Sequence, residues 1–537
     1  MNSHGCDVDF SARYRWMAFA LIFAITLIRL LYIALWCPLD LAPDEAHYWD
    51  WSRDLDFGYY SKGPLVAWLI RASCASLGDT IFAVRLPAAL CGGLLLFGLH
   101  ALTREVYRSD RLALVVAAVA MTLPLIAAGA SLMTIDAPFT CAWMWALVFA
   151  HRAIFRPTSW AWLGAGLCVM LGMLAKHTML LFVPSLALFL ATTPTARTML
   201  WRRGFWIMTA LAAIGGVPIL IWNAVKNWPM LEHTSVHVGV DEEVRIRWFG
   251  PIAYVAGQFA ILLGVWFIAW VGAIWRHRPT LEERPEQRFL WWMSAPTFIF
   301  FAAFSLLNGG GEPNWPIVGY LAGMVLAAGW VREQWHHAEL SHRLLMRSSL
   351  AGAVLLGLLV IYVMHQPLEV QPILLRIAGP ASEAEPMPLR RIDPTSRLRG
   401  WRHLAAEVDR LRNELRSRGV EPVLAGERWT HASELGFYCA GQPRCYCLGT
   451  LLGDRRSQFD LWRLNPVADP DAFAGRTFVV VGLELERLQF AFDRIEPARV
   501  IEYRENGELI AIWTITVGHG YHAAPAENEP SVPDREG

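Results

Sequence analysis

Long apolar runs dominate the first two thirds of the chain. A helix needs about 20 mostly apolar residues to cross roughly 30 Å of hydrocarbon. Some of the runs are shorter than this or nearly contiguous. They lie at 16–36, 81–102, 112–130, 136–151, 159–174, 178–193, 205–222, 251–275, 289–307, 314–331 and 348–364. The pattern predicts a polytopic α-helical membrane protein with about 11 transmembrane helices.

The first run is expected to remain in the protein as a transmembrane helix. It is too long for the apolar core of a signal peptide and lacks a small-residue cleavage site.

Arginine is concentrated in every second connection between these runs, near 13–15, 104–111, 152–156, 197–203, 276–288 and 332–347. Cytoplasmic loops carry the excess of positive charge in membrane proteins. We therefore expect a cytoplasmic N-terminus. The opposite connections are predicted to lie outside: 37–80, 131–135, 175–177, 223–250 and 308–313. An odd number of spans then places the C-terminal part of the chain in the periplasm.

The chain changes character after Pro367. Residues 403–419 have apolar positions at helical spacing and end in Gly419, whereas 421–427 and 477–482 are typical of buried strands. Residues 500–517 predict a β-hairpin around Asn506-Gly507. We expect a transmembrane domain at 1–365, with a large first outer loop at 37–80, and a periplasmic α/β domain at 366–518. The polar segment 519–537 is expected to be disordered.

Composition narrows the classes of function. Hydrophobic residues make up 55% of the 537 residues and charged residues 18%, and the formal net charge is zero, so nothing indicates a nucleic-acid partner. Cys439, Cys445 and Cys447 lie close together in the outer domain. One disulfide among them is compatible with an extracytoplasmic location.

The first outer loop has an unusual composition. It reads LAPDEAHYWDWSRDLDFGYYSKGPLVAWLI over 41–70 and combines the adjacent carboxylates Asp44 and Glu45 with Lys62. Long loops between spans tend to be functional. An interfacial aromatic belt is an alternative explanation for its three Trp residues, Trp49, Trp51 and Trp68. A belt explains neither the paired carboxylates nor the lysine.

Two further outer sites combine charge with an apolar surrounding. Asp136 stands where the fourth span begins, and an N-cap role is the structural alternative there. Lys176-His177 lies between two other spans. All three lysines of the chain, Lys62, Lys176 and Lys226, fall on the predicted outer side, against the usual charge bias. This placement predicts an anionic partner.

These residue types suit sugar transfer from a phospholipid carrier. Lysines can stabilise the leaving phosphate, and a carboxylate can deprotonate the acceptor. The chain also resembles a known family through several stretches: DEAHYWDWS, FGYYSKGPLVAWL, MTIDAPF, GMLAKHTMLLFVP, IWNAVKNWP, EPNWP, LRGWRHLAAEV and ASELGFYCAG. It is similar to glycosyltransferase family 39 and its bacterial relatives, which include protein O-mannosyltransferases and the lipid A aminoarabinose transferase. These enzymes use polyprenyl-phosphate sugars and have the GT-C fold.

The resemblance implies roles for individual residues. Asp44 would be the catalytic carboxylate, with Glu45 beside it, and Asp136 a second acidic group near the acceptor. Lys62 and Lys176 would bind the carrier phosphate. Four flanking residues complete the candidate substrate site: His47, Tyr59, Tyr60 and His177. Many relatives have His-Pro-Pro or Lys-Pro-Pro where this chain has Ser61-Lys62-Gly63-Pro64, so the register of Lys62 stays open.

No metal site is predicted. The aminoarabinose branch has a zinc site without a convincing counterpart in this sequence, although Glu45 and His47 are the residues that could be recruited. Dependence on a divalent metal therefore stays open.

The predicted function is transfer of a monosaccharide from an undecaprenyl phosphate carrier to an envelope acceptor on the periplasmic face of the inner membrane, with inversion. The acceptor could be lipid A, another glycan or a protein. Arg245 or Arg247 could assist the lysines. The alternatives are a transporter or flippase of a lipid-linked sugar, or a membrane scaffold. Charges at the outer mouth and the lack of an internal repeat favour the enzyme.

Overall fold

The computed structural model describes residues 11–156, 158–238, 246–279, 284–482 and 489–522. It consists of two compact units. The helical unit contains residues up to 36 and 56–362, and the sheet unit contains 37–55 and the chain from 363 onward.

All eleven apolar runs predicted from the sequence are helical. The helical unit contains α1 (Ala12–Leu35), α3 (Leu65–Leu77), α4 (Ile81–Tyr107), α5 (Asp110–Ala120), α6 (Pro124–Gly129), α7 (Asp136–Phe155), α8 (Ser159–Ala175), η1 (His177–Leu181), α9 (Phe182–Thr192), η2 (Arg197–Trp201), α10 (Arg203–Val225), α11 (Pro229–Val238), α12 (Gly250–Ile261), α13 (Val265–Arg276), α14 (Pro285–Trp292), α15 (Ala295–Asn308), α16 (Ile317–His337) and α17 (Leu340–His365). Several runs are therefore built from two successive helices.

Five helical stretches in the described part of the chain are long and apolar enough to cross a membrane: α1, α4, α10, α14 with α15, and α17. The α12–α13 pair would make a sixth, but it is bent by 115°. The bend falls at Leu263 and Gly264, whose φ angles of 54° and 66° end the first helix. The run at 251–275 is thus a broken span or a re-entrant segment.

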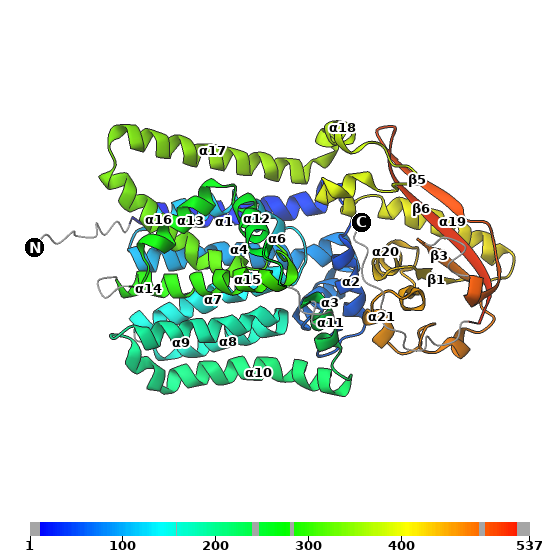
Figure 1. Cartoon of the computed structure of the whole chain (residues 1–537), viewed down its shortest axis with the longest axis horizontal. Helices are drawn as coiled ribbons and strands as arrows, with labels where there is room; N and C mark the ends of the chain where they lie inside the picture. The colour runs from blue at the N-terminus through cyan, green and yellow to red at the C-terminus, as the bar shows by residue number, and fades with distance from the viewer. Residues whose placement is uncertain (1–10, 157, 239–245, 280–283, 483–488, 523–537) are drawn as a thin grey trace, which may run out of the picture. The chain divides into compact units, whose positions relative to one another are not determined.

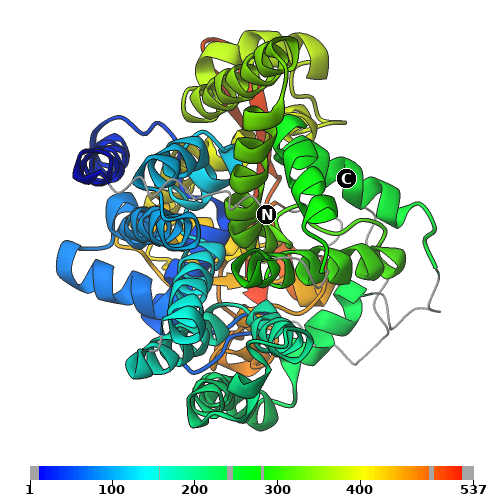
Figure 2. The same ribbon diagram turned by 90° about the vertical axis from the view of Figure 1, so that its left-hand side faces the viewer.

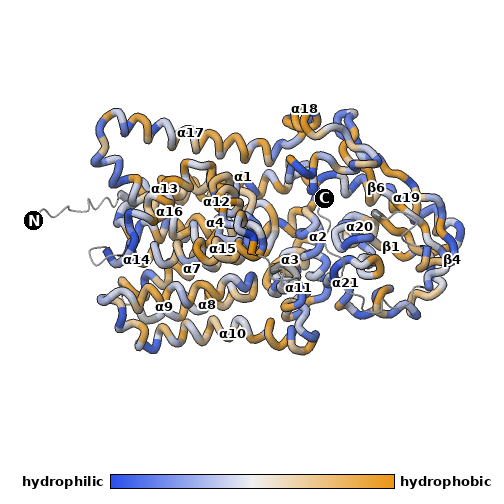
Figure 3. The backbone as a smooth tube through the Cα atoms, in the orientation of Figure 1, coloured by the Kyte–Doolittle hydropathy of each residue, from blue (hydrophilic) through white to orange (hydrophobic). Residues whose placement is uncertain are grey.

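The long helices of this unit pack side by side. α8 lies between α7 and α10 in Figure 1, and Figure 2 shows the bundle nearly end-on. Apolar residues follow these helices along their length in Figure 3. Small residues allow close approach where lipid offers no hydrophobic driving force. Gly215 on α10 illustrates this, because a Cβ there would lie 2.7 Å from the carbonyl oxygen of Met170 on α8.

The sheet unit combines short helices with one mixed sheet. Its elements are α2 (Pro43–Arg53), α18 (Pro367–Ala378), η3 (Pro388–Arg391), η4 (Pro394–Leu398), α19 (Trp401–Ser417), β1 (Val423–Gly426), α20 (Trp429–Tyr438), β2 (Cys445–Cys447), η5 (Gly449–Leu452), α21 (Gln458–Leu461), η6 (Pro470–Phe473), β3 (Phe478–Val481), η8 (Gln489–Ala491), β4 (Phe492–Ile495), β5 (Arg499–Glu505) and β6 (Glu508–Tyr521). The strand order is β2-β1-β3-β6-β4, and β5 pairs with β6. The first three strands are parallel, and β6 runs antiparallel to its neighbours.

The predicted α/β character of this unit is confirmed at several elements. The helix at 403–419 is α19, and the two buried strands are β1 and β3. Asn506 and Gly507, with φ angles of 51° and 86°, form the turn between β5 and β6, as expected for a two-residue hairpin. The boundary at 519 was too early, because β6 continues to Tyr521. The Tyr521 hydroxyl is buried and donates to the carbonyl of Pro466 at 2.7 Å. Residues 523–537 lie outside the described residues.

The segment 37–55, expected to belong to the transmembrane domain, is part of the sheet unit. α2 packs against α20. The carboxylate of Asp40 accepts a hydrogen bond from the backbone N–H of Trp401 at 2.9 Å, and the backbone N–H of Leu41 donates to the hydroxyl of Tyr438 at 2.7 Å. These contacts join residues about 360–400 positions apart in sequence, which no local pattern can predict.

Two of the loop tryptophans are buried rather than interfacial. Trp49 and Trp51 are each 1% exposed, and Trp49 packs edge-on against Phe437 with ring centroids 4.9 Å apart. The aromatic-belt explanation is therefore wrong for these two residues. Cys439, Cys445 and Cys447 are buried free thiols.

Candidate active site

An acidic and a basic side chain meet at one end of the helical unit. Lys176, directly after α8, donates to Asp136 Oδ1 at 2.7 Å, and Asp136 is the first residue of α7. The second carboxylate oxygen, Oδ2, accepts a hydrogen bond from Asn314 Nδ2, also at 2.7 Å. The side chains of Asp136 and Lys176 are 15% and 11% exposed. Both oxygens of this carboxylate are thus engaged in a largely buried polar cluster.

The N-cap explanation for Asp136 is wrong. α7 has Ile135 at its N-cap position, and no side chain caps the helix there. The carboxylate instead contacts a lysine and an asparagine from two other parts of the fold.

The loop that carries Lys62 lies against the end of α8. A Cβ on Gly63 would fall 2.2 Å from the carbonyl oxygen of Leu174, so only glycine allows this approach. This contact accounts for the glycine where relatives have proline. Because Leu174 precedes Lys176 by two residues, the backbone beside Lys62 is held next to the segment that carries the second lysine.

Hydrogen bonds make this loop compact. The backbone N–H of Tyr59 donates to the carbonyl of Lys62 at 3.1 Å, and the Tyr59 hydroxyl accepts from the N–H of Asp56 at 3.1 Å. Trp222 on α10 donates its indole N–H to Asp56 Oδ2 at 2.7 Å. Tyr59 is fully buried, so its side chain supports the loop.

His177 lies where the two lysine-bearing segments meet. The positive charges of Lys62 and Lys176 both act on its ring. Its Nε2 contacts Met230 Sδ at 3.3 Å. Tyr60, on the loop of Lys62, packs edge-on against His233 with ring centroids 5.3 Å apart. The structure thus brings five of the candidate residues together in the helical unit: Tyr59, Lys62, Asp136, Lys176 and His177.

The sheet unit carries the adjacent carboxylates Asp44 and Glu45, which differ in their exposure to solvent. Glu45 is fully buried, and its Oε2 accepts a hydrogen bond from the backbone N–H of Ala42 at 2.9 Å, which closes the first turn of α2. Asp44 is exposed, with the hydroxyl of Tyr48 at 3.5 Å from its Oδ1. Asp44 is therefore the carboxylate of the pair that is accessible to a substrate.

His47 is enclosed by aromatic rings. Its ring stacks on Phe459 at 5.4 Å and lies 4.8 Å from Trp429, and its Nδ1 is 2.9 Å from the hydroxyl of Ser433. Burial, and then the charge of Arg455, lower the pKa of His47 to about 3. Its surroundings are those of a neutral packing residue.

Among the described residues, no group of three or more His, Cys, Asp and Glu side chains could hold a metal ion. Arg245 lies outside the described residues. The backbone N–H of Arg247 donates to the carbonyl of Leu306 at 2.7 Å.

Sequence reasoning missed several polar residues of the helical unit. Asn314 was recognised only as part of EPNWP, and nothing local indicated that it meets Asp136. Arg29 and Arg85 are 6% and 1% exposed within α1 and α4. An ionisable residue inside a predicted span is a functional candidate by default, so their positions could have marked them.

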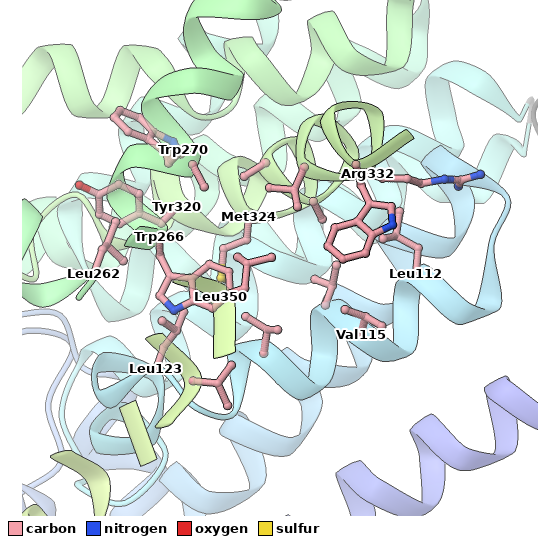
Figure 4. A pocket seen from close by; sticks show the side chains of 18 of the residues that line it. Leu112, Val115, Leu123, Leu262, Trp266, Trp270, Tyr320, Met324, Arg332 and Leu350 are labelled. Carbon is pink, nitrogen blue, oxygen red and sulfur yellow. The ribbon is translucent and has the colours of Figure 1, made fainter. Parts of the chain in front are cut away.

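The helical unit also contains an apolar cavity of about 440 Å³. It is lined by α5, α13, α16 and α17, with Trp270 and Tyr320 at one end and Arg332 at the other (Figure 4). Tyr320, at one end of the cavity, lies six residues after Asn314 in the sequence.

The fold and part of the sequence match known proteins. Residues 61–222 match the family model described as dolichyl-phosphate-mannose-protein mannosyltransferase. The crystal structure of ArnT from Cupriavidus metallidurans bound to undecaprenyl phosphate aligns with a TM-score of 0.59 and 15% identity, over 93% of this chain and 98% of that chain. The chain has the GT-C fold. The apo structure of the same ArnT aligns with a TM-score of 0.58 and 16% identity, over 94% and 98%.

Curated relatives support the resemblance seen in the sequence. The lipid A galacturonosyltransferase RgtD of Rhizobium johnstonii is 28% identical over 55% of this chain and 62% of its own length. An undecaprenyl phosphate aminoarabinose transferase of Pseudomonas fluorescens is 24% identical over 60% and 58%. The chain spans less than two thirds of each relative's length. The resemblance to glycosyltransferase family 39 is confirmed, and the chain is a multi-pass membrane protein.

Proposed function

We propose that this protein is a glycosyltransferase that moves a monosaccharide from a polyprenyl phosphate carrier to an envelope acceptor. The observation that carries the proposal is the convergence of Lys62, Lys176 and His177 at one end of the helical unit. The reaction releases a lipid phosphate, and preorganised cations stabilise the charge that develops on it. The relatives are a lipid A galacturonosyltransferase and an undecaprenyl phosphate aminoarabinose transferase, and both names agree with this chemistry.

The arginine-rich loops support a site at the outer face of a bacterial inner membrane, with the sheet unit in the periplasm. The apolar cavity next to α16 supports a substrate with a hydrocarbon tail. Lys62 binds the phosphate of the carrier, and Lys176 contributes positive charge while held by Asp136. Asp44 acts as the base that deprotonates the acceptor. The acceptor attacks the anomeric carbon, the bond to phosphate breaks, and the configuration inverts.

Binding of undecaprenyl phosphate to the purified protein tests the phosphate role. Lys62→Ala is expected to lower the affinity about tenfold or more, since a hydrogen bond to a charged group contributes about 1.5–3 kcal/mol. Lys226→Ala removes an exposed lysine and is the matched control. Unchanged affinity in Lys62→Ala would refute the role of this lysine.

Turnover of a polyprenyl-phosphate sugar separates the enzyme from its alternatives. Asp44→Asn is expected to reduce transfer at least about 100-fold, since a positioned base contributes roughly 10²–10⁴-fold. Carrier affinity should stay unchanged. A flippase would translocate the intact donor without breaking the sugar–phosphate bond. Release of sugar at the wild-type rate by Asp44→Asn would exclude Asp44 as the base.

A further inference from the structure

The topology of the sheet unit creates an edge where parallel strands end together. The chain leaves β1 through α20 to reach β2 on one side, and later returns to form β3 on the other side of β1. In open α/β sheets, ligands bind outside the carboxyl ends of the strands at the point where the connections diverge. That point lies after Gly426 of β1 and Val481 of β3.

Three arginines lie near this edge. Trp401 links η4 to it, because its indole N–H donates to the carbonyl of Arg397 at 2.8 Å and its ring centroid lies 6.0 Å from that of His431 on α20. Arg428 follows β1 and precedes α20, while Arg390 and Arg397 belong to η3 and η4. Burial, and then the charges of Arg397 and Arg428, lower the pKa of Arg390 to about 10, while buried Glu434 acts in the opposite direction. Within the described residues, none of the three guanidinium groups makes a hydrogen bond or an ion pair. Three guanidinium groups therefore lie here together with the carboxylates of Glu427 and Glu434, and none of the three forms an ion pair with them.

A buried imidazole lies at the same edge. His431 is 9% exposed, and its Nδ1 makes no hydrogen bond in the described structure. Gly482, which follows β3 with φ of 98°, faces the ring so closely that a Cβ would lie 2.7 Å from Nδ1 and 3.1 Å from Glu427 Oε2. The charges of Arg390 and Arg428 both act on this histidine. A buried polar atom without a partner is uncommon in folded proteins.

We propose that this edge of the sheet unit binds the anionic group of a saccharide, a phosphate or a carboxylate, through Arg390, Arg397 and Arg428. The planar guanidinium group matches both oxyanions with paired N–H donors. The identity of this saccharide rests on the proposed transferase function. The lysines of the helical unit are assigned to the carrier phosphate, so the saccharide at this edge is the head of the acceptor. The site thus predicts an acidic or phosphorylated glycan as acceptor.

Calorimetry on the full-length protein in lipid nanodiscs tests the site with three probes: glucose 1-phosphate, glucuronic acid and uncharged glucose. At least one anionic sugar is expected to bind, and glucose is not. Binding of only one anion identifies the group as phosphate or carboxylate. The Arg397→Ala, Arg428→Ala double variant should weaken binding at least about tenfold, which corresponds to about 1.4 kcal/mol. Both residues are exposed, so their replacement spares the core.

Arg410→Ala is the control, because this exposed arginine on α19 pairs only with Glu407 among the described residues. Its affinity for the probes should equal that of wild type. Equal binding of glucose, or equal affinity in the double variant, would overturn the proposal. In a transfer assay the double variant should raise the KM for the acceptor and leave kcat unchanged. If wild type transfers no sugar but binds the anions through these arginines, the proposed activity fails and the site stands.

Discussion

Asp136 and Lys176 form a largely buried ion pair. Single and double variants of the pair can separate its contribution to stability from its contribution to sugar transfer. Removing one partner of such a pair leaves an uncompensated charge, which typically costs about 3–5 kcal/mol. Asp136→Asn should therefore lower thermal stability strongly. The double variant Asp136→Asn, Lys176→Met should recover most of this loss. A purely structural pair would recover transfer as well, whereas a phosphate-binding Lys176 predicts stable but inactive protein.

Gly63 makes a separate prediction about the loop of Lys62. A Cβ there would meet the carbonyl of Leu174 at 2.2 Å, and such overpacking typically costs about 1–3 kcal/mol. Gly63→Ala should displace Lys62 and weaken binding of undecaprenyl phosphate. Gly129→Ala, which meets no atom within 4 Å, should leave stability and binding unchanged. Normal carrier affinity in Gly63→Ala would show that the close approach does not position the lysine.

Two buried histidines predict a loss of stability in mild acid. Burial holds the pKa of His47 and His431 at about 3, below the value of about 6.5 in the unfolded chain. The unfolded state therefore binds more protons between pH 6.5 and 3, and each histidine costs about 2 kcal/mol at pH 5. Asp50 opposes this, because burial raises its pKa to about 6 and protonation below pH 6 favours the folded form.

Hydrogen exchange of the sheet unit at pH 7 and pH 5 measures this balance. The net effect should be a loss of roughly 2–3 kcal/mol at pH 5. His47→Phe should remove about half of the histidine contribution, since its ring sits among aromatic side chains. If this variant transfers sugar at the wild-type rate, His47 has a packing role only. If the pH dependence of stability is unchanged, the buried His47 ring is not a source of the acid destabilisation.

At the scale of elements, apolar spacing was the most informative signal. It located the eleven apolar runs, but not α3 and α11, which lie in connections that were predicted as outer loops. The Asn506-Gly507 turn located the last hairpin. The strands β2 and β4 were missed. β1 and β3 are continuous buried apolar runs, whereas β2 has only three residues and β4 has the exposed charged residues Asp493 and Arg494 at its centre. The partners of Asp136 were missed because Asn314 is 178 residues away in sequence. Candidate residues were found by type and by resemblance, and their contacts came only from the fold.

The junction between Asp40 and α19 can be tested directly. Asp40 accepts from the first backbone N–H groups of α19, where a carboxylate is worth about 0.5–2 kcal/mol. Asp40→Ala should increase proteolysis within 37–55 and slow transfer. Asp493→Ala, at an aspartate whose side chain is 75% exposed, should do neither. An unchanged cleavage rate in Asp40→Ala would show that α2 is held by its other contacts alone.

For the whole molecule, the arginine pattern predicts a cytoplasmic N-terminus and a periplasmic sheet unit. A C-terminal alkaline phosphatase fusion should be active, and a C-terminal green fluorescent protein fusion should be dark. The opposite pair of results would place Lys62 and Lys176 on the side of the membrane where a periplasmic acceptor cannot reach them.

The assignment of residues 37–55 to the sheet unit has a consequence for biosynthesis. The ribosome makes Asp40 and α2 early, but α19, whose first backbone N–H groups donate to Asp40, begins only at Trp401, 361 residues beyond Asp40. At roughly 5–20 residues per second, this delay is about 20 to 70 s. During that time the nascent chain carries Asp44 on a peptide that has not yet made its contacts within the sheet unit. Because of this early synthesis, we expect the exported segment either to need a chaperone or to mature slowly after translation ends.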